Sequence, residues 1–198
     1  MAEPWQALLD WWFGSAETPD EIAADKGKLW FGKGHDRQAR ERFGDQVEQA
    51  LAGGLTEWAQ RPEGWLALVL LLDQLPRMIF RNTPKSFSGD LRAQALVAQG
   101  LAAGFDGQLK PIQRVFIYLV LEHCENLAVQ NEAVSRFINL VREQPEAQRA
   151  VFEDNLDYAE RHQKIIARFG RFPHRNAVLG RESTADELEF LSRPGSRF

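Results

Sequence analysis

The sequence has a single cysteine, Cys124, among 198 residues. An internal disulfide is therefore excluded, and this composition is typical of a reducing compartment. The longest uninterrupted apolar run, Trp65 to Leu72, is far shorter than the ~20 residues that cross a bilayer. The chain opens Met-Ala-Glu-Pro, without the basic start and apolar stretch of a signal peptide. We therefore expect a cytoplasmic protein with no membrane partner.

Motifs of several enzyme classes are also missing. No Gly-x-x-x-x-Gly-Lys-Ser/Thr phosphate loop occurs, and FGKGH at residues 31–35 is only a turn with a lysine. Neither a Gly-x-Ser-x-Gly elbow nor the ligand spacing of zinc sites is present. We therefore exclude ATP-dependent chemistry of the phosphate-loop kind and hydrolases of the elbow type. We expect no metal or cofactor and leave open whether the protein is an enzyme.

The chain is rich in large aromatic side chains, and its charge is unevenly distributed. Six Trp and thirteen Phe are present, and each can bury roughly 150–250 Å² of surface, so a substantial core is expected. The formal charge is -4, yet the segment Arg161–Arg181 holds six cations and two histidines without an acid. Because this basic segment is set in an acidic protein, any anion binding must be local.

Helical periodicity dominates, and no alternating pattern typical of β-strands appears. Capping boxes, in which a threonine precedes a glutamate by three residues, predict helix starts after Thr18 and Thr184. Gly14 and Gly170 predict helix ends. Helices are expected over residues 5–12, 35–51, 65–75, 87–101, 112–121, 127–141 and 151–169, with further helices starting at Pro19 and Ala185.

Two of these helices are apolar on every side, which indicates burial on all faces. We predict an all-α protein in which these two fully buried central helices span about 64–75 and 111–123, with amphipathic helices around them. The chain is expected to form one unit over residues 1–198, with possible sub-lobes of about 1–85 and 86–198.

The first central helix ends in an unusual polar sequence, LLDQLPRMIFR. Asp73 and Gln74 follow eight apolar residues, and Pro76 removes one backbone hydrogen bond and disfavours helical geometry at the residue before it. A kink or a restart of the helix is therefore expected. If the helix resumes, Asp73, Arg77 and Arg81 share one face, and Asp73 can pair with Arg77.

The second central helix ends in LEHCEN, which contributes Glu122, His123, Cys124 and Glu125. An ionised group left unpaired at the end of a buried helix costs several kcal/mol, so these side chains must meet water or partners. The basic segment can supply the partners, because guanidinium groups bind carboxylates and phosphates through two parallel hydrogen bonds.

Within the basic segment, a helix leads into a loop that contains proline. His162 falls on the same face as Ile165, so it is expected on the apolar side of the helix. After Gly170, the sequence RFPHRN predicts a turn that presents Arg171, Arg175 and their neighbours from a loop.

Two explanations remain open for these polar groups. In the first, the arginines hold Asp73, Glu122, Glu125 and Asp157 in a purely structural network. In the second, acids and arginines do not cancel, and a positive cleft binds a small ligand with a phosphate or carboxylate group. The candidate ligand-binding residues are Asp73, Gln74, Arg77, Arg81, Glu122, His123, Glu125, His162, Arg168, Arg171, His174, Arg175, Asn176 and Arg181, of which His123, His162 and His174 are the candidate acid/base groups.

These segments resemble a known family, the bacterial domain-of-unknown-function family 924. The similarity lies in WFG at residues 12–14, LLDQLPRMIFR at 71–81, LEHCEN at 121–126 and the long stretch at 158–191. The resemblance implies a tetratricopeptide-like fold of stacked antiparallel helices, but no reaction and no catalytic residue. In that family serine often stands where Cys124 stands here, which argues against a mechanism that requires this thiol.

The competing function is a tetratricopeptide-like interaction module, in which an exposed groove between helices takes a peptide from a protein partner. Cations and aromatics alternate in residues 168–175, as they do on RNA-stacking surfaces. Phe169 and Phe172 nevertheless fit the apolar phase of a packed helix end, and the overall charge is acidic. We therefore do not expect nucleic acid as a partner.

Overall fold

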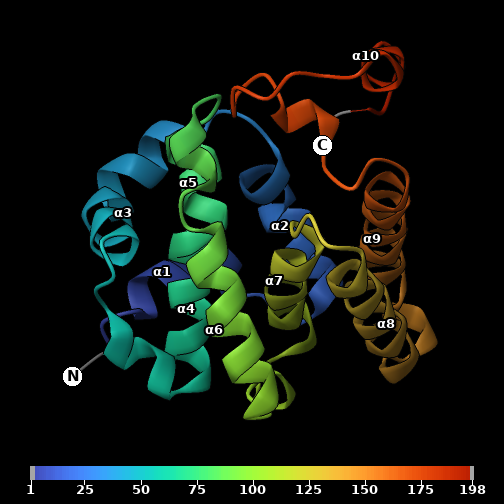
Figure 1. Ribbon diagram of the computed structural model, residues 1–198. Coiled ribbons are helices and arrows are strands. Elements are labelled where there is room, and N and C mark those ends of the chain that lie inside the picture. Colours follow the sequence, from blue (N-terminus) through green and yellow to red (C-terminus); the bar gives the residue numbers. More distant parts are fainter. Residues whose placement is uncertain (1–2, 197–198) are drawn as a thin grey trace.

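In a computed structural model that describes residues 3–196, the regular structure of these residues is entirely helical, which confirms the all-α class (Figure 1). The α-helices are α1 (Gln6–Phe13), α2 (Pro19–Phe31), α3 (Asp36–Leu51), α4 (Pro62–Leu72), α5 (Gln74–Ile79), α6 (Asp90–Ala102), α7 (Pro111–Glu122), α8 (Leu127–Glu143), α9 (Ala150–Phe169) and α10 (Ala185–Leu191). Short 3-10 helices lie in the connections: η1 (Thr56–Gln60), η2 (Pro84–Phe87), η3 (Asp106–Gln108), η4 (Glu146–Gln148) and η5 (Pro173–Arg175).

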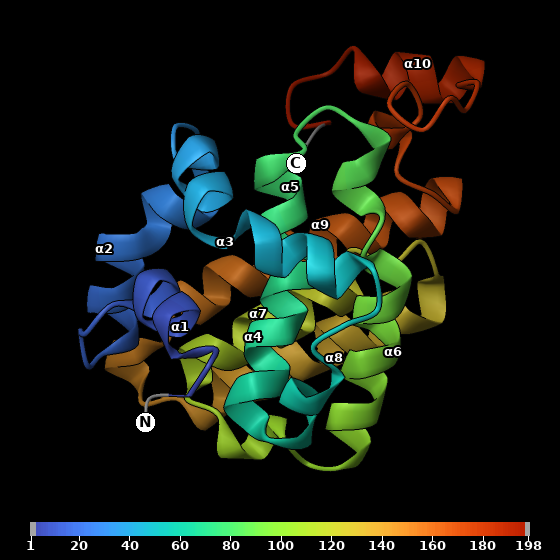
Figure 2. The ribbon, with the colours of Figure 1, turned by 90° about the vertical axis from the view of Figure 1, so that its left-hand side faces the viewer.

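The longer helices pack side by side in a succession that follows the chain. Figure 1 shows α3, then α4 with α5, then α6, α7, α8 and α9. In this succession α3 contacts α4 and α5, α6 contacts α4 and α7, and α8 contacts α7 and α9. Helices α1 and α2 lie together at one side in Figure 2, and α2 also reaches α9. Each central helix is therefore covered by neighbours.

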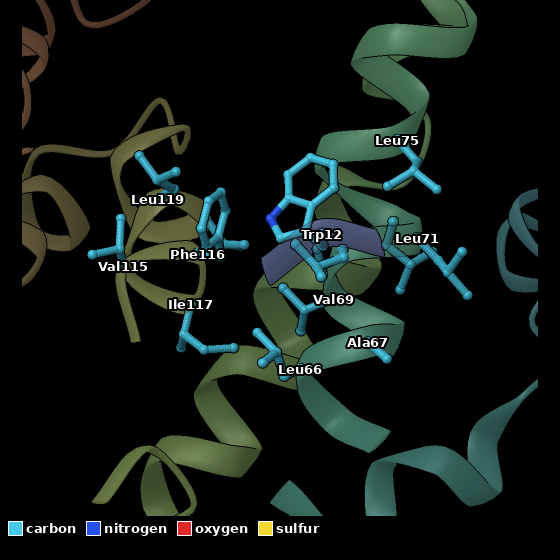
Figure 3. Packing of buried hydrophobic residues seen from close by; sticks show 14 of the residues in the cluster. Trp12, Leu66, Ala67, Val69, Leu71, Leu75, Val115, Phe116, Ile117 and Leu119 are labelled. Atoms are coloured by element: carbon cyan, nitrogen blue, oxygen red, sulfur yellow. The ribbon is translucent and has the colours of Figure 1, made fainter. Parts of the chain in front are cut away.

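The two central helices, α4 and α7, form the middle of the core. Their facing side chains point toward each other, and Trp12 of α1 lies between them (Figure 3). Trp12 is fully buried and meets Phe116 edge-on, with 5.4 Å between ring centroids. All residues of α4 from Gly64 to Leu72 are buried, as are those of α7 from Val115 to Glu122. The predicted burial of these helices is confirmed.

Local sequence signals place most helix ends. Both predicted capping boxes, at Thr18 and Thr184, are formed. Gly170 ends α9 with a φ of 69°, a left-handed geometry that glycine adopts without steric cost. Two predicted helices have other bounds. The first central helix, expected over about 64–75, spans Pro62–Leu72 and is followed after Asp73 by α5. The helix expected from residue 87 begins at Asp90, because the chain first makes a 3-10 turn over Pro84–Phe87.

After α9 the chain turns back across one end of the bundle (Figure 1). This C-terminal segment, residues 171–196, contains η5 and α10, which contact each other. Its Phe172 is fully buried and joins Ile165 and Ile166 of α9 in a small apolar cluster separate from the main core. The segment therefore has its own packing, and it meets the bundle through Phe172, Arg175 and Arg181.

No helix among residues 3–196 combines the length and the apolar composition needed to cross a bilayer. The tetratricopeptide-like arrangement stays a prediction, as does the single unit over 1–198 with its possible sub-lobes of about 1–85 and 86–198. The opening Met1-Ala2 and the last two residues lie outside the described residues.

Candidate functional site

The first polar residues of the site lie where the first central helix is interrupted. Helix α4 ends at Leu72 and α5 begins at Gln74, with Asp73 between them at φ -110° and ψ -58°. Pro76 explains the break, because it lacks the N–H that would bond to the Leu72 carbonyl and its ring crowds that oxygen. The expected restart is confirmed, and it leaves a carboxylate at a fully buried position.

Asp73 is held by side chains of α5 and by His123, the residue after α7. Its Oδ1 lies 2.7 Å from Nδ1 of His123 and 3.0 Å from Nη1 of Arg77. Gln74 Nε2 donates to Oδ2 over 2.7 Å. Burial alone would raise the pKa of Asp73, but the charge of Arg77 and the hydrogen bonds with His123 and Gln74 hold it well below its usual range. Asp73 is therefore ionised, and its predicted pairing with Arg77 is confirmed.

Arg77 also binds Asp90, a carboxylate that the sequence did not single out. Its Nη1 and Nη2 donate to the two oxygens of Asp90 over 2.8 and 3.0 Å. Asp90 is the first residue of α6, and Gly89 before it packs against the Leu72 carbonyl. A Cβ at Gly89 would lie 2.1 Å from that oxygen. The absence of a side chain at Gly89 therefore allows α6 to begin against the break between α4 and α5.

Arg175 reaches the same place from the C-terminal segment. Its Nη1 lies 3.8 Å from Oδ2 of Asp90, and its guanidinium is 4.5 Å from the ring centroid of Phe172 and 5.0 Å from that of Phe87. The residue is only 7% exposed, and its side chain donates no hydrogen bond to any residue within 3–196. Burial, with the charge of Arg77, lowers the pKa of Arg175 to about 10, so it stays protonated at neutral pH.

Of the three candidate acid/base histidines, His123 and His174 lie within range of the Arg175 charge, and His162 packs against Phe172. Burial is the main cause that lowers the pKa of His123, although the neighbouring Asp73 opposes it. Burial, together with nearby positive charge, lowers the pKa of His174 to about 3. His162 is buried on α9, as expected, and its Nδ1 lies 2.9 Å from Oε1 of Glu122. His123 and His174 are therefore neutral at neutral pH.

Two further ion pairs involve the C-terminal segment: Arg181 ties it to the bundle, and Arg171 pairs with a residue of the segment itself. Both Nη groups of Arg181 bind Glu125, over 2.6 and 2.9 Å, and its Nε donates to Asn176. Arg171 binds Glu187 over 2.7 and 2.8 Å. The donors of these arginines are used within the protein, so Arg171 and Arg181 fit the structural network that was one of the two explanations.

The cluster is balanced in formal charge but not in hydrogen bonds. Asp73 and Asp90 lie beside Arg77 and Arg175, so the acids and arginines at this position cancel. The excess positive charge of the second explanation is therefore not found in this group. Arg77 uses its donors on both carboxylates, whereas Arg175 has one distant carboxylate and two aromatic faces. The site therefore has hydrogen-bond donors on Arg175 that no group within residues 3–196 accepts, but it has no net positive charge.

Two candidate residues lie away from the cluster. Arg81 binds Asp36 of α3 through two hydrogen bonds of 2.8 Å. Because α5 ends at Ile79, the four-residue spacing from Asp73 does not extend to Arg81, and its expected place on that face is wrong. Arg168 is exposed on α9, with its guanidinium 4.6 Å from the ring centroid of Phe169.

Cys124 links the cluster to a groove of about 390 Å³ among α6, α7 and α8. The half-buried thiol lines the groove together with Ala98, Leu121 and Val129. It also lies close enough to Arg175 for the guanidinium charge to act on it. Burial outweighs that charge and raises the pKa of Cys124, so the thiol is protonated at neutral pH and is a poor nucleophile.

Sequence reasoning missed Asp90 and Phe87, which contact Arg77 and Arg175. No local signal marks them, because they meet the arginines only through the path of the loop between α5 and α6. Among residues 3–196, no group of three or more His, Cys, Asp or Glu side chains has the arrangement of a metal site.

Comparison with known proteins gives a family and a fold but no activity. Residues 8–195 match a family model described as a bacterial protein of unknown function (DUF924). A solved structure of a protein of unknown function from Agrobacterium tumefaciens is similar to this one, with a TM-score of 0.79 and 33% sequence identity. The match covers 94% of this chain and 96% of that chain. No curated protein matches the chain.

Proposed function

We propose a function for this chain, which belongs to the bacterial DUF924 family of unknown function, from the geometry of Arg175. The protein binds a small anionic ligand whose carboxylate or phosphate group accepts hydrogen bonds from the Arg175 guanidinium. The observation that carries this proposal is a buried, protonated guanidinium that donates no hydrogen bond to residues 3–196. The single cysteine supports a cytoplasmic setting for this binding.

The physical reason is the cost of unused donors. A buried polar group without a hydrogen bond costs about 1–3 kcal/mol, and more when it is charged. A planar carboxylate or a phosphate offers two acceptors that match the guanidinium fork. Phe172 and Phe87 fix the plane of that fork through cation–π contacts, so the donors are already oriented. His123 and His174 lie at the edge of the site, where their candidate acid/base role stays a prediction.

The first test measures thermal stability with acetate and with inorganic phosphate. A ligand at 100 times its Kd stabilises the folded state by roughly 2.7 kcal/mol, which corresponds to about 5–10 °C in Tm for a protein of this size. We expect such a rise in the wild type and none in Arg175→Met, which keeps an apolar stem but has no donors. Arg175→Lys should retain part of the rise, because it keeps the charge but loses the fork.

The matched control is Arg168→Ala, which removes an exposed arginine of the same segment. We expect this variant to keep the full response to anions. The proposal is wrong if no anion stabilises the wild type, or if Arg175→Met responds as the wild type does. In that case Arg175 belongs to the structural network, with Arg171 and Arg181.

A second candidate function is recognition of a protein partner by a tetratricopeptide-like module. The groove among α6, α7 and α8 favours it, since Ala98, Leu121 and Val129 make it partly apolar. This function predicts a partner whose binding is lost on changes in the groove and is unaffected by Arg175→Met. A pull-down with the two kinds of variant separates it from anion binding.

A further inference from the structure

We infer that the ligand of Arg175 is an amphiphilic monocarboxylate whose apolar chain lies in the groove among α6, α7 and α8. This inference rests on the proposed function, since it names the class of ligand that the same site takes. It follows from three features of the structure: one end of the groove lies near Arg175, the lining of the groove is partly apolar, and charge around Arg175 is already balanced.

The groove and Arg175 adjoin through two separate elements. On α6, Asp90, Gln94, Ala98 and Ala102 follow one another at four-residue spacing, so they lie along one face of the helix. Asp90 at the start of this row is 3.8 Å from Arg175, and the next three residues line the groove. On the side of α7, Cys124 lines the groove and is within range of the Arg175 charge. Arg175 therefore lies beyond the Gln94 end of the groove, beside Asp90, and is not itself one of the residues that line it.

The lining suits an apolar chain. Leu101 and Ala102 of α6, Leu121 of α7 and Val129 of α8 all contribute to it. The charged residues on the rim are paired with each other, since Arg136 binds Glu132 over 2.8 Å and also reaches Asp106. The groove thus offers an apolar strip beside the polar side chains of Gln94, Glu132 and Arg136, and Arg175 lies beyond its Gln94 end.

The charge of the head group follows from the neighbours of Arg175. Asp90 is 3.8 Å away, and the charges of Glu125 and Asp73 also act on the guanidinium. With Arg77 and Arg175 balanced by Asp73 and Asp90, each added negative charge meets carboxylates that are already present. A monocarboxylate supplies two acceptors with one charge, whereas a phosphate dianion brings a second charge that neither Arg77 nor Arg175 is left to balance. The geometry therefore selects a carboxylate over a phosphate.

The length of the chain follows from α6. Gln94 and Ala102 are eight residues apart on a helix that rises 1.5 Å per residue, so this side of the groove is about 12 Å long. An extended acyl chain of about eight carbons has a similar length. Each methylene that is fully buried tightens binding about fourfold. A chain that is half covered by the groove should therefore bind at least about 50-fold more tightly than acetate.

The experiment measures dissociation constants of acetate, butanoate, octanoate and 1-octanol by ligand-observed NMR on the full chain. We expect octanoate to bind at least about 50-fold more tightly than acetate, with butanoate between them and 1-octanol much weaker than octanoate. Arg175→Met should lose acetate and octanoate alike, because both depend on the head-group donors.

Substitutions in the groove separate the contribution of the ligand's acyl chain to affinity from that of its carboxylate. Ala98→Phe fills the groove and should weaken octanoate at least about tenfold while acetate is unchanged. Ala95→Phe is the matched control, because Ala95 is an exposed alanine of the same helix that does not line the groove. It should bind both acids as the wild type does.

Three outcomes overturn the inference. If acetate and phosphate bind through Arg175 but affinity is independent of chain length, the proposed function stands and the amphiphilic ligand is wrong. If octanol binds as tightly as octanoate and Arg175→Met binds both, the groove takes apolar molecules without using Arg175. If no anion binds at all, the inference and the proposed function fail together.

Discussion

At the scale of single residues, burial decides which groups of the cluster carry charge. Arg175 and Asp73 stay charged although both are buried, because each has an opposite charge nearby. His174 has positive neighbours instead, and its pKa is lowered to about 3, mainly by burial. The same end of the bundle therefore holds charged acids and arginines beside a neutral imidazole, and this difference is measurable as a pH dependence of stability.

We expect His174 to make the protein less stable as the pH falls below about 6.5. In the unfolded chain its imidazole takes up a proton near its ordinary pKa of 6.5, whereas in the folded state it stays neutral down to about pH 3. Protonation therefore favours the unfolded state throughout this window, by about 1–2 kcal/mol at pH 5 after allowance for partial exposure. The measurement is urea unfolding at pH 7 and at pH 5.

The comparison is between the wild type and His174→Gln. The loss of unfolding free energy between pH 7 and pH 5 should be smaller in the variant by about 1–2 kcal/mol. His35→Gln, at the start of α3 and away from the cluster, controls for the removal of a histidine. An equal loss in His174→Gln and in the wild type would show that His174 titrates normally.

At the scale of elements, the site depends on a helix that is broken and a helix that starts beside the break. Pro76 prevents the first central helix from continuing through Asp73, and Gly89 allows α6 to begin against the backbone carbonyl of Leu72. These two residues together bring Asp90 within reach of Arg77 and Arg175. The position of α6 is therefore a condition for the cluster and for the groove beside it.

Gly89→Ala should destabilise the protein by at least about 2 kcal/mol. The added Cβ would lie 2.1 Å from a backbone oxygen, and backbone cannot move aside as a flexible side chain can. Gly27→Ala should have the opposite sign, because Gly27 lies within α2 with no atom in the way of a Cβ. It should stabilise by about 0.5–1 kcal/mol. Equal effects of the two substitutions in urea unfolding would contradict this account.

At the scale of the whole molecule, the C-terminal segment is the part that closes the site. It brings Arg175 to the bundle, yet its own apolar cluster is small, with Phe172, Ile165 and Ile166 at its centre. The bidentate pair between Arg181 and Glu125 links the segment to the connection between α7 and α8. The segment is therefore expected to open more readily than the core around α4.

Arg181→Ala should loosen the C-terminal segment without unfolding the bundle. Loss of the ion pair costs roughly 1–2 kcal/mol, so amides of α10 should exchange with solvent about 5–30 times faster. Hydrogen exchange measured by mass spectrometry should show no change in α4. Arg193→Ala removes an exposed pair with Glu189 on the same segment and should have little effect. Faster exchange throughout the chain would show instead that the segment and the core open together.

The elements of this fold could be predicted from local signals. The capping threonines, the all-round apolar helices and the proline at residue 76 act within one or two turns of chain, so their consequences are visible in the sequence. The Asp73–Arg77 pair belongs to the same class, since its members are four residues apart. The features that could be predicted are those in which the interacting residues lie close together along the chain.

The partners of the candidate arginines could not be predicted in this way. Several acidic residues were possible partners for each arginine, and the sequence does not distinguish one bidentate pair from another. Arg81 binds Asp36, Arg181 binds Glu125, and Arg171 binds Glu187, across separations of 45, 56 and 16 residues. Asp90 entered the cluster only because Gly89 permits a close backbone approach.

The sequence by itself therefore determined that this protein is helical, which helices are buried, and that ionisable groups stand at their ends. These properties follow from periodicity and from interactions over a few residues. Only the tertiary structure decided that Arg175, rather than Arg171 or Arg81, reaches Asp90 and keeps unused donors. The reason is physical: charge can be counted along a chain, but whether a hydrogen bond forms depends on the position and direction of groups that the fold brings together.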